Sequence, residues 1–321
     1  MKNQGITISV ITPCYNVDQY IAENLDSVLS QTVMPLEVIC VDDGSKDKTI
    51  SIIESYKSKY PDLIQLYRNE ENKGAPFSRN KGMEHSKGEY LQFLDADDII
   101  FPTKFDHQQK LILGTEVHPD ILVGSFTKKF LDGTDKEYVN EDVDKWVALI
   151  DNRIGVTSGN LFKKSSVQAV GGWTEYLKSS QEYDLMFRMM QQNATVLFDT
   201  VKVNINRERP SGSITKSNPK EKWKRYINLR VRIFEHLAAS GQITSERESA
   251  FLVNMLNAVR ILYRYDRNAA LNYYKTYMKG KPLPTGASNI NNIYKKLYGT
   301  FGFDVAQRIT LFLKGEKISE T

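Results

Sequence analysis

Cysteine is scarce in this 321-residue sequence, which contains only Cys14 and Cys40. Both lie in apolar stretches of the kind that form buried strands, so we expect two buried thiols. Two cysteines exclude a disulfide framework and a cysteine-rich zinc site. Free thiols suit a reducing compartment, and a cytoplasmic location is therefore expected.

Long hydrophobic runs are also absent. The N-terminus, MKNQGITISVITPCYN, has no uninterrupted apolar core of signal-peptide length. Nowhere do about 18 apolar residues follow one another, which is the length that a membrane-spanning helix needs. We expect a protein that neither carries a signal peptide nor spans a membrane. The composition, 40% hydrophobic and 26% charged, is that of an ordinary globular chain and does not indicate disorder.

Charge is unevenly distributed along the chain. Residues 220–321 carry a net charge of +10, and residues 1–219 carry −6. The basic residues of the C-terminal part are dispersed through helical patterns and form no runs, so nucleic acid is not expected as a partner. Three interpretations remain open for this part: a packed helical extension, peripheral attachment to anionic lipid on the inner face of the membrane, and a homo-oligomer interface.

The first hundred residues alternate between strand and helix patterns. Apolar, β-branched runs at 6–14, 36–41 and 64–68 predict strands, and amphipathic stretches ending near residue 31 and spanning about 47–60 predict helices between them. Strands that are buried on both faces and alternate with helices form parallel sheets. The sequence therefore predicts an α/β fold with a mixed, mainly parallel sheet flanked by helices.

Three carboxylates follow the next apolar run, YLQFL, at once: Asp95, Asp97 and Asp98. So close together they repel one another unless a cation or a polar ligand neutralises them. On an extended chain, alternation would place Asp95 and Asp97 on one side, with Ala96 between them leaving room for a ligand. This spacing suits Mn²⁺ or Mg²⁺ beside a diphosphate. A solvated acidic turn is the alternative.

A second acidic turn, at Asp42 and Asp43, also follows a predicted strand. Ligands of open α/β sheets gather at the carboxyl ends of strands, so we expect both acidic turns to face one crevice. A carboxylate there can accept a hydrogen bond from a nucleobase N–H or from ribose; an Asx turn or a helix cap is the alternative. Arg79 and Asn80 are expected to open a helix that points into this region and that Gly88 ends.

Further strands are predicted at 121–126, 157–162, 195–198 and 201–205, with a hairpin turn at 133–135. A helix is predicted from Glu182. After residue 220 the pattern becomes wholly helical, with four amphipathic segments. We therefore expect one domain at 1–218 and a helical domain at 219–321.

Six segments in this order resemble the family-two glycosyltransferases, which have a GT-A fold. They are TPCYN, VDDGS, NKGAPFSRNKG, GEYLQFLDADD, GGWTEYL and QEYDLMFRM, between residue 6 and about residue 190. The resemblance implies a metal-dependent, inverting transferase that moves a sugar from a nucleotide-sugar, commonly a UDP-sugar, to a saccharide or glycolipid. It points to the synthesis of bacterial-type surface polysaccharide.

The resemblance also implies roles for residues on the donor side. Asp43 corresponds to the acid that contacts uracil, and Asp95 and Asp97 correspond to the D-x-D motif, with Asp97 as the direct metal ligand. The remaining donor-side residues that it implies are Thr12, Pro13, Tyr15, Arg79 and Ala96.

On the acceptor side, the resemblance places Gly172, Trp173 and Gln181 beside the acceptor and makes Glu182 the general base. The family more commonly has aspartate at this base position, but either carboxylate can take a proton from a hydroxyl group within hydrogen-bond reach. The alternative is that Glu182 merely favours the start of its helix. Asp184, two residues further on, is expected to be structural.

The polar segment NRERPSGSITKSNP is interpreted as a loop that closes over the diphosphate, with Arg207, Arg209 and Ser213 as its candidate contacts. A surface linker is an equal alternative, since this segment has no histidine.

Two other functions are alternatives for a chain with these features. A sugar-1-phosphate nucleotidyltransferase needs a glycine-rich, basic loop after its first strand, and residues 12–16 have neither glycine nor a basic residue. A non-catalytic scaffold that associates with glycans or lipids would tolerate the loss of a carboxylate, and this chain keeps all of them.

Overall fold

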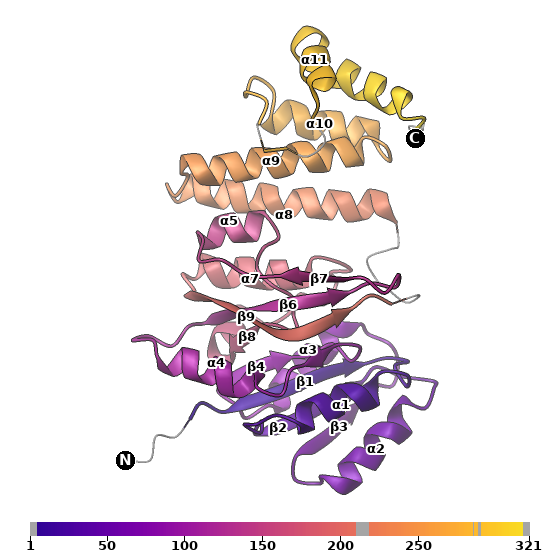
Figure 1. Ribbon diagram of the computed structural model, residues 1–321, viewed down its shortest axis with the longest axis vertical. Coiled ribbons are helices and arrows are strands. Elements are labelled where there is room, and N and C mark those ends of the chain that lie inside the picture. The colour runs from indigo at the N-terminus through magenta and orange to yellow at the C-terminus, as the bar shows by residue number, and fades with distance from the viewer. Residues whose placement is uncertain (1–4, 210–217, 285, 288–289, 317–321) are drawn as a thin grey trace. The chain divides into compact units, whose positions relative to one another are not determined.

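A computed structural model of the chain describes residues 5–209, 218–284, 286–287 and 290–316. The chain forms two compact units (Figure 1). The first comprises Met1–Lys145 and Asn152–Gly212, and the second comprises Trp146–Asp151 and Ser213–Thr321. The sequence does not indicate that residues 146–151, far from the C-terminal helices along the chain, belong with them.

The first unit is built on a nine-stranded sheet with the order β3-β2-β1-β4-β8-β6-β9-β5, in which β7 pairs with β6. Strands β3, β2, β1 and β4 are mutually parallel, β6 and β9 are parallel, and β8 runs antiparallel to β4 and β6. The predicted α/β fold with a mixed, mainly parallel sheet is confirmed. The strands are β1 (Ile8–Cys14), β2 (Glu37–Asp42), β3 (Ile64–Arg68), β4 (Tyr90–Phe93), β5 (Ile99–Ile100), β6 (Ile121–Lys129), β7 (Asp135–Tyr138), β8 (Leu161–Lys163) and β9 (Val196–Arg207).

Two strand predictions are wrong in detail. The expected strand at 157–162 is strand only from Leu161, because residues 156–160 form a turn in which Gly159 N–H donates to Val156 O at 2.8 Å. The two strands expected at 195–198 and 201–205 are one strand, β9, whose pairing with β6 shifts register around Ser125. A bulge of this kind lets one strand continue through a local bend.

Helices cover both faces of the sheet. Helices α1 (Ile21–Leu29), α2 (Thr49–Lys59) and α4 (Lys104–Leu113) contribute to a core with Val10 and Val38. Helix α3 (Ala75–His85) packs on the other face, against Ile11. A Cβ at Gly82 would lie 2.4 Å from Ile11 Cγ2, so glycine is what allows α3 to approach β1 so closely. Helices α6 (Lys164–Ala169) and α7 (Gln181–Gln191) complete the unit.

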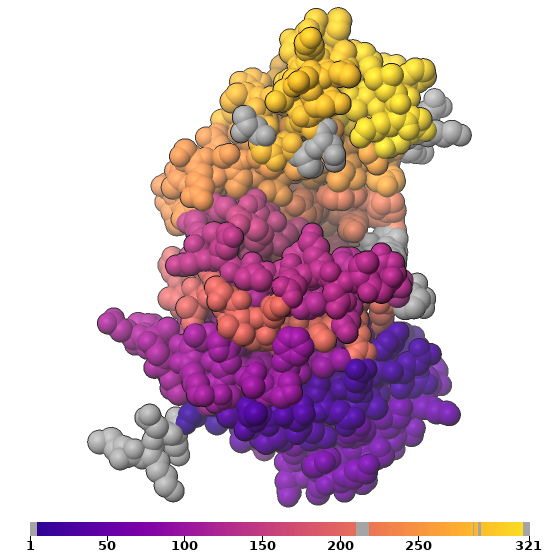
Figure 2. Space-filling view, in the orientation of Figure 1, coloured from indigo at the N-terminus to yellow at the C-terminus, as the bar shows by residue number. Residues whose placement is uncertain are grey.

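The second unit is helical. It contains α5 (Lys145–Ile150), α8 (Pro219–Ala239), α9 (Ser245–Leu262), α10 (Arg267–Tyr277) and α11 (Asn292–Leu313). Side chains cap four of these helices, since Asn218, Thr244, Asp266 and Asn291 each accept a backbone N–H of the first turn. Gly302, at φ 77°, interrupts α11. Figure 2 shows residues of these C-terminal helices, in orange and yellow, at the surface of the unit.

Among the helices that the structure describes, none is long and apolar enough to cross a membrane.

Candidate active site

The carboxylates that follow β4 lie on a tight turn. Strand β4 ends at Phe93, and the backbone N–H of Asp98 donates to the carbonyl oxygen of Asp95 at 2.9 Å. The expectation that Asp95 and Asp97 alternate along an extended chain is therefore wrong. Asn24 of α1 holds the turn, because its Nδ2 donates to the carbonyl oxygens of Asp95 (3.0 Å) and Asp98 (2.8 Å).

Two side chains of this turn are buried. Ala96 is 2% exposed and its side chain packs in the core. Asp98 accepts hydrogen bonds from Ser158 Oγ (2.6 Å), Asn206 Nδ2 (3.0 Å) and the backbone N–H of Arg207 (3.0 Å). Burial, and then the neighbouring carboxylates, raise the pKa of Asp98 to about 8. Asp98 therefore fixes the turn to β9 and is not available to a ligand.

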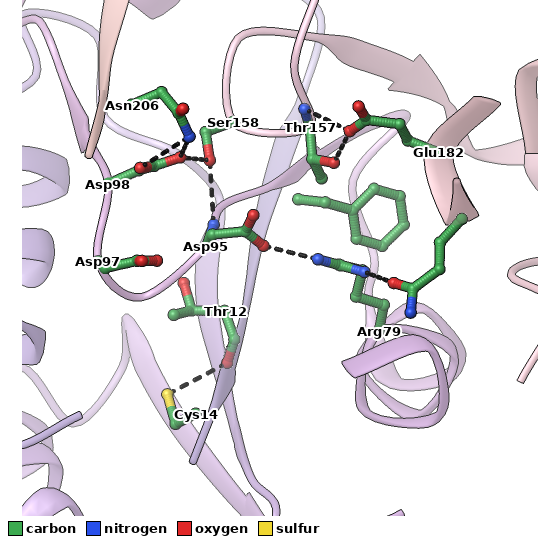
Figure 3. A network of polar contacts seen from close by, with 12 residues as sticks. Thr12, Cys14, Arg79, Asp95, Asp97, Asp98, Thr157, Ser158, Glu182 and Asn206 are labelled. Carbon is green, nitrogen blue, oxygen red and sulfur yellow. Dashed lines mark hydrogen bonds and ion pairs between the residues drawn. The ribbon is translucent and has the colours of Figure 1, made fainter. Parts of the chain in front are cut away.

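The other two carboxylates each face an arginine. Asp95 pairs with Arg79 at 2.6 Å, and Asp97 pairs with Arg209 (Figure 3 shows the carboxylates). Burial and the charge of Asp95 raise the pKa of Asp97, and Arg209 opposes that shift. The charged form of the partly buried Asp97 carboxylate is therefore stabilised by the nearby positive charge of Arg209.

Arg79 connects the acidic turn to helix α7. The sequence predicted that Arg79 opens its own helix, α3. That prediction is wrong, because α3 begins at Ala75 and Arg79 lies in its second turn. Its guanidinium donates to Asp95 (Figure 3) and to Gln181 Oε1 at 3.1 Å. It also lies 4.5 Å from the centre of the Trp173 ring. Arg79 is 5% exposed, so this charge is held away from water between three partners.

The Gly172–Trp173 segment is fastened to α3 by Asn80. Asn80 Oδ1 accepts the backbone N–H of Trp173 at 2.8 Å, and Asn80 Nδ2 donates to the carbonyl oxygen of Trp173 at 2.9 Å. Gly172 has φ 72°, and a Cβ there would lie 2.5 Å from Asn80 Oδ1, so this position requires glycine. Trp173 packs edge-on against Phe93 at 5.1 Å. The structure therefore brings Trp173 and Gln181 together around Arg79.

Glu182 lies in the first turn of α7 and faces the turn that precedes β8. Its Oε2 accepts the backbone N–H of Thr157 at 2.9 Å and also the hydroxyl group of Thr157 (Figure 3). Burial raises the pKa of the Glu182 carboxyl, and the bonds from Thr157 and the charge of Arg79 partly offset that rise. A carboxyl with a raised pKa and one bound oxygen has the properties of a general base.

Asp184 faces a different set of partners. Its Oδ2 accepts Thr174 Oγ1 (2.8 Å) and Arg188 Nε (2.9 Å). Arg188 in turn donates to the carbonyl oxygens of Val170 (2.6 Å) and Gly172 (2.7 Å). Asp184 therefore supports the segment that leads to Trp173.

The acidic turn after β2 organises the loop after β3. Asp43 Oδ1 accepts Asn69 Nδ2 (2.8 Å) and the backbone N–H of Lys73 (3.0 Å), and its Oδ2 accepts the N–H of Gly74 (2.7 Å). Asp42 accepts the N–H groups of its own turn, as an Asx turn does. Strands β2 and β4 flank β1 and are parallel to it, so both acidic turns lie at the same edge of the sheet.

The loop after β1 contains the remaining donor-side candidates. Thr12 Oγ1 is buried and has no hydrogen-bond partner among the described residues. Tyr15 is 44% exposed, and Pro13 is half-buried at the end of β1. Asn16 ties this loop to the turn after β2, since its N–H donates to Ser45 Oγ at 3.0 Å.

The residues predicted to close over the diphosphate differ in their surroundings. Arg207 pairs with Glu23 at 2.6 Å and donates its N–H to Asp98. Arg209 pairs with Asp97. Ser213 lies outside the described residues.

Sequence reasoning missed four residues that hold this site together: Asn24, Thr157, Ser158 and Asn206. Each is a short polar residue that acts through a contact distant in sequence, and no local pattern marks it. Cys14 and Cys40 are both buried and free, as expected.

A polar cavity of about 390 Å³ lies beside α3 and does not include the acidic turn after β4. Its lining includes Asn69, Lys73, Phe77, Asn80 and Glu175. The carboxylates with raised pKa values, Asp97 and Asp98, lie at the turn and not in this cavity.

Within the described residues, no three His, Cys, Asp or Glu side chains form a ready cluster for a metal ion. A divalent cation that also binds a diphosphate needs only one or two protein carboxylates, with phosphate and water completing its shell. Asp97 supplies hard oxygen ligands next to Asp95, and its only cationic partner among these residues is Arg209. The residues present therefore fit Mn²⁺ or Mg²⁺.

Curated relatives match the front part of the chain. An uncharacterised glycosyltransferase of Rickettsia typhi is 34% identical over 206 residues, 60% of this chain and 61% of the relative. The minor teichoic acid biosynthesis protein GgaB of Bacillus subtilis is 37% identical over 108 residues, 33% of this chain and 12% of GgaB. The chain thus spans less than two thirds of the length of these relatives.

Two solved structures share the fold. TarS 1–349 of S. aureus, in complex with UDP-GlcNAc, has a TM-score of 0.60 and 17% identity, and covers 88% of this chain and 100% of that one. The mannosyltransferase PcManGT of Pyrobaculum calidifontis, in complex with GDP-Man and Mn²⁺, has a TM-score of 0.52 and 18% identity, and covers 85% of this chain and 76% of that one. The likeness confirms the GT-A-like architecture.

The model of the family described as Glycosyl transferase family 2 matches residues 9–172, just over half of the sequence. This match means that the chain belongs to glycosyl transferase family 2.

Proposed function

We propose that this protein transfers a sugar, with inversion, from a UDP-sugar to a hydroxyl group of a saccharide or glycolipid acceptor. One observation carries the proposal. The buried guanidinium of Arg79 contacts Asp95 on one side and Gln181, the neighbour of Glu182, on the other. A donor-binding acid and a base are thereby held on two sides of a single rigid group, as a transfer between two substrates requires.

The nucleotide is held by the loops after β1 and β2. Asp43, already fixed by the Asn69–Gly74 loop, accepts the nucleobase N–H with a remaining lone pair. The half-exposed ring of Tyr15 contacts the nucleotide, and Asp95 accepts the ribose hydroxyls. Fixed acceptors of this kind select the nucleotide before any chemistry occurs.

Asp97 would hold the divalent cation next to the diphosphate. Such a cation, when bound, neutralises the charge that develops on the leaving diphosphate. Arg207 and Arg209 lie at the same turn and supply further positive charge to the phosphate oxygens. Asp97 pairs with Arg209 in this structure, so a cation held by Asp97 would leave the guanidinium of Arg209 available to the diphosphate.

Glu182 is the base. Thr157 binds only Oε2, and the described residues give no hydrogen bond to Oε1, which can accept the hydroxyl group of the acceptor. Glu182 removes that proton as the acceptor oxygen attacks the anomeric carbon from the face opposite the leaving diphosphate. A new glycosidic bond forms, the bond from the anomeric carbon to the diphosphate breaks, and the configuration inverts. Trp173 and Gly172 lie on the acceptor side of this centre.

The products belong to bacterial-type surface polysaccharide; the match to GgaB, a teichoic acid biosynthesis protein, supports that assignment. The test is a calorimetric titration of UDP-, GDP- and dTDP-sugars in the presence of Mn²⁺, followed by transfer assays with the donor that binds. Binding of one UDP-sugar, lost in Asp95→Asn and kept in Asp62→Asn at the surface, is the expected result. If no nucleotide-sugar binds, the proposal is wrong.

A further inference from the structure

Helix α11 carries all the large, exposed apolar side chains that the structure describes in the helical unit. The exposed fractions are 59% for Ile293, 60% for Phe301, 83% for Phe312 and 67% for Leu313, and Val305 is 36% exposed. In Figure 2 the residues of α11, in yellow, lie at the surface of this unit. The apolar side chains of α8 and α9, by contrast, build the core of the unit.

The second half of α11, after the break at Gly302, is apolar on two faces. Phe303, Ala306 and Leu311 are buried against the rest of the unit. Val305 and Phe312 are seven residues apart, so they lie on one outward stripe. A helix whose inner face is already packed and whose outer face is still apolar is suited to a second environment of low polarity.

The charges around this outer face are positive. The carboxylates near it are engaged within the unit, because Asp304 pairs with Arg267 at 2.5 Å and Glu316 pairs with Arg264 at 2.8 Å. The exposed cations of the helix and of the residue that follows it have no ion-pair partner among the described residues; they are Lys295, Lys296, Arg308 and Lys314. Apolar side chains next to unpaired cations are the combination that binds an anionic lipid surface.

We propose that the outer face of α11 docks on an anionic lipid bilayer, with Phe312 and Leu313 entering the interface and Arg308 and Lys314 contacting the headgroups. A second copy of the chain is the less favoured occupant. A two-fold contact through this face would place the same cations opposite one another. A bilayer with anionic headgroups neutralises them instead. The proposal goes beyond the transfer reaction and does not depend on it.

The test uses the full chain and sedimentation with vesicles of phosphatidylcholine, with and without phosphatidylglycerol. Binding should need phosphatidylglycerol and should weaken as salt rises, because exposed charges are screened beyond about 8 Å at physiological ionic strength. The double variant Phe312→Ser, Leu313→Ser should bind at least about tenfold more weakly, given the apolar area that it removes from the interface. Arg308→Glu with Lys314→Glu should abolish the preference for phosphatidylglycerol.

Val117→Ser is the matched control, because Val117 is 70% exposed in the other unit, and this variant should bind as the wild type does. These substitutions are at exposed positions, and circular dichroism checks that each variant is folded. Equal binding by Phe312→Ser, Leu313→Ser and the wild type overturns the proposal. So does sedimentation velocity that shows a wild-type dimer which this double variant dissociates, since the face would then bind a second copy.

Discussion

Thr157 directs both its backbone N–H and its hydroxyl group to one oxygen, Oε2, of Glu182. The next residue, Ser158, donates to Asp98 at 2.6 Å and accepts the backbone N–H of Asp95 at 3.2 Å. Two consecutive residues therefore set the position of the proposed base relative to the acidic turn. The distance between the two halves of the site is fixed by a short, largely buried piece of backbone.

The first prediction concerns the hydroxyl group of Thr157. Thr157→Val keeps the bond from the backbone N–H and removes the bond from the hydroxyl group. Because the hydroxyl bond lowers the pKa of Glu182 in the wild type, that pKa should rise further in this variant. Because a base works deprotonated, activity is lost as pH falls through this pKa, and the acid limb of the pH–rate profile should move to higher pH. Thr157→Ser should restore the wild-type profile; superimposable profiles for all three proteins contradict the prediction.

The second prediction concerns the cation. UDP binding, measured by calorimetry in Mn²⁺, should weaken markedly when EDTA is added, because the charge of the diphosphate is no longer offset. Asp97→Asn should have the same effect. Asp106→Asn, on the outside of α4, should bind UDP normally in Mn²⁺. If UDP affinity stays at the value of the wild type in Mn²⁺ both when EDTA is added and in Asp97→Asn, Asp97 holds no metal.

The N-terminal half of the sheet could be predicted from the sequence because its signals are local. Strand β3 was expected at 64–68 and is Ile64–Arg68, and β1 and β2 differ from the predictions by one or two residues. Short, continuous apolar runs that alternate with helices have few interpretations other than strands of a parallel sheet that are buried on both faces. The acidic ends of the strands followed directly from those runs.

The geometry of the site could not be predicted in the same way. The turns at 95–98 and 156–160 are fixed by Asn24 and Lys104, which reach them from other elements. A pattern of alternating residues contains no information about such bonds. Residues 146–151 belong with the helical unit for a similar reason: Arg230 Nε donates to the carbonyl oxygen of Ile150 at 3.2 Å.

The third prediction concerns the buried Lys104. Its Nζ donates to the carbonyl oxygen of Gly159 (2.6 Å) and to Gln108 Oε1 (2.8 Å), and burial lowers its pKa from 10.5 to about 7. Below pH 7 both the folded and the unfolded chain bind the proton. Between about pH 7 and 10.5 only the unfolded chain retains it, so this lysine makes the free energy of unfolding rise with pH, by up to a few kcal/mol.

Urea unfolding of Lys104→Met across this range should lack that rise. Lys110→Met is the control, because Lys110 lies on the same helix and is exposed, with only an i,i+4 pair to Asp106. It should keep the pH dependence of the wild type. Parallel curves for the wild type and Lys104→Met would mean that Lys104 stays protonated in the folded protein.

The last prediction separates Glu182 from Asp184. Glu182→Gln keeps the size of the side chain and removes the base, so turnover should fall by roughly 10² to 10⁴ while donor affinity stays nearly unchanged. Asp184→Asn should act mainly on stability, because it weakens the bonds that Arg188 Nε and Thr174 Oγ1 donate. The expected loss is about 1–3 kcal/mol of unfolding free energy.

The two residues lie two positions apart on α7 and therefore point to different sides, so only one can face the acceptor. Turnover, donor affinity and urea unfolding of both variants decide the matter. Near-normal turnover in Glu182→Gln, or a loss of turnover confined to Asp184→Asn, would assign the base to another residue.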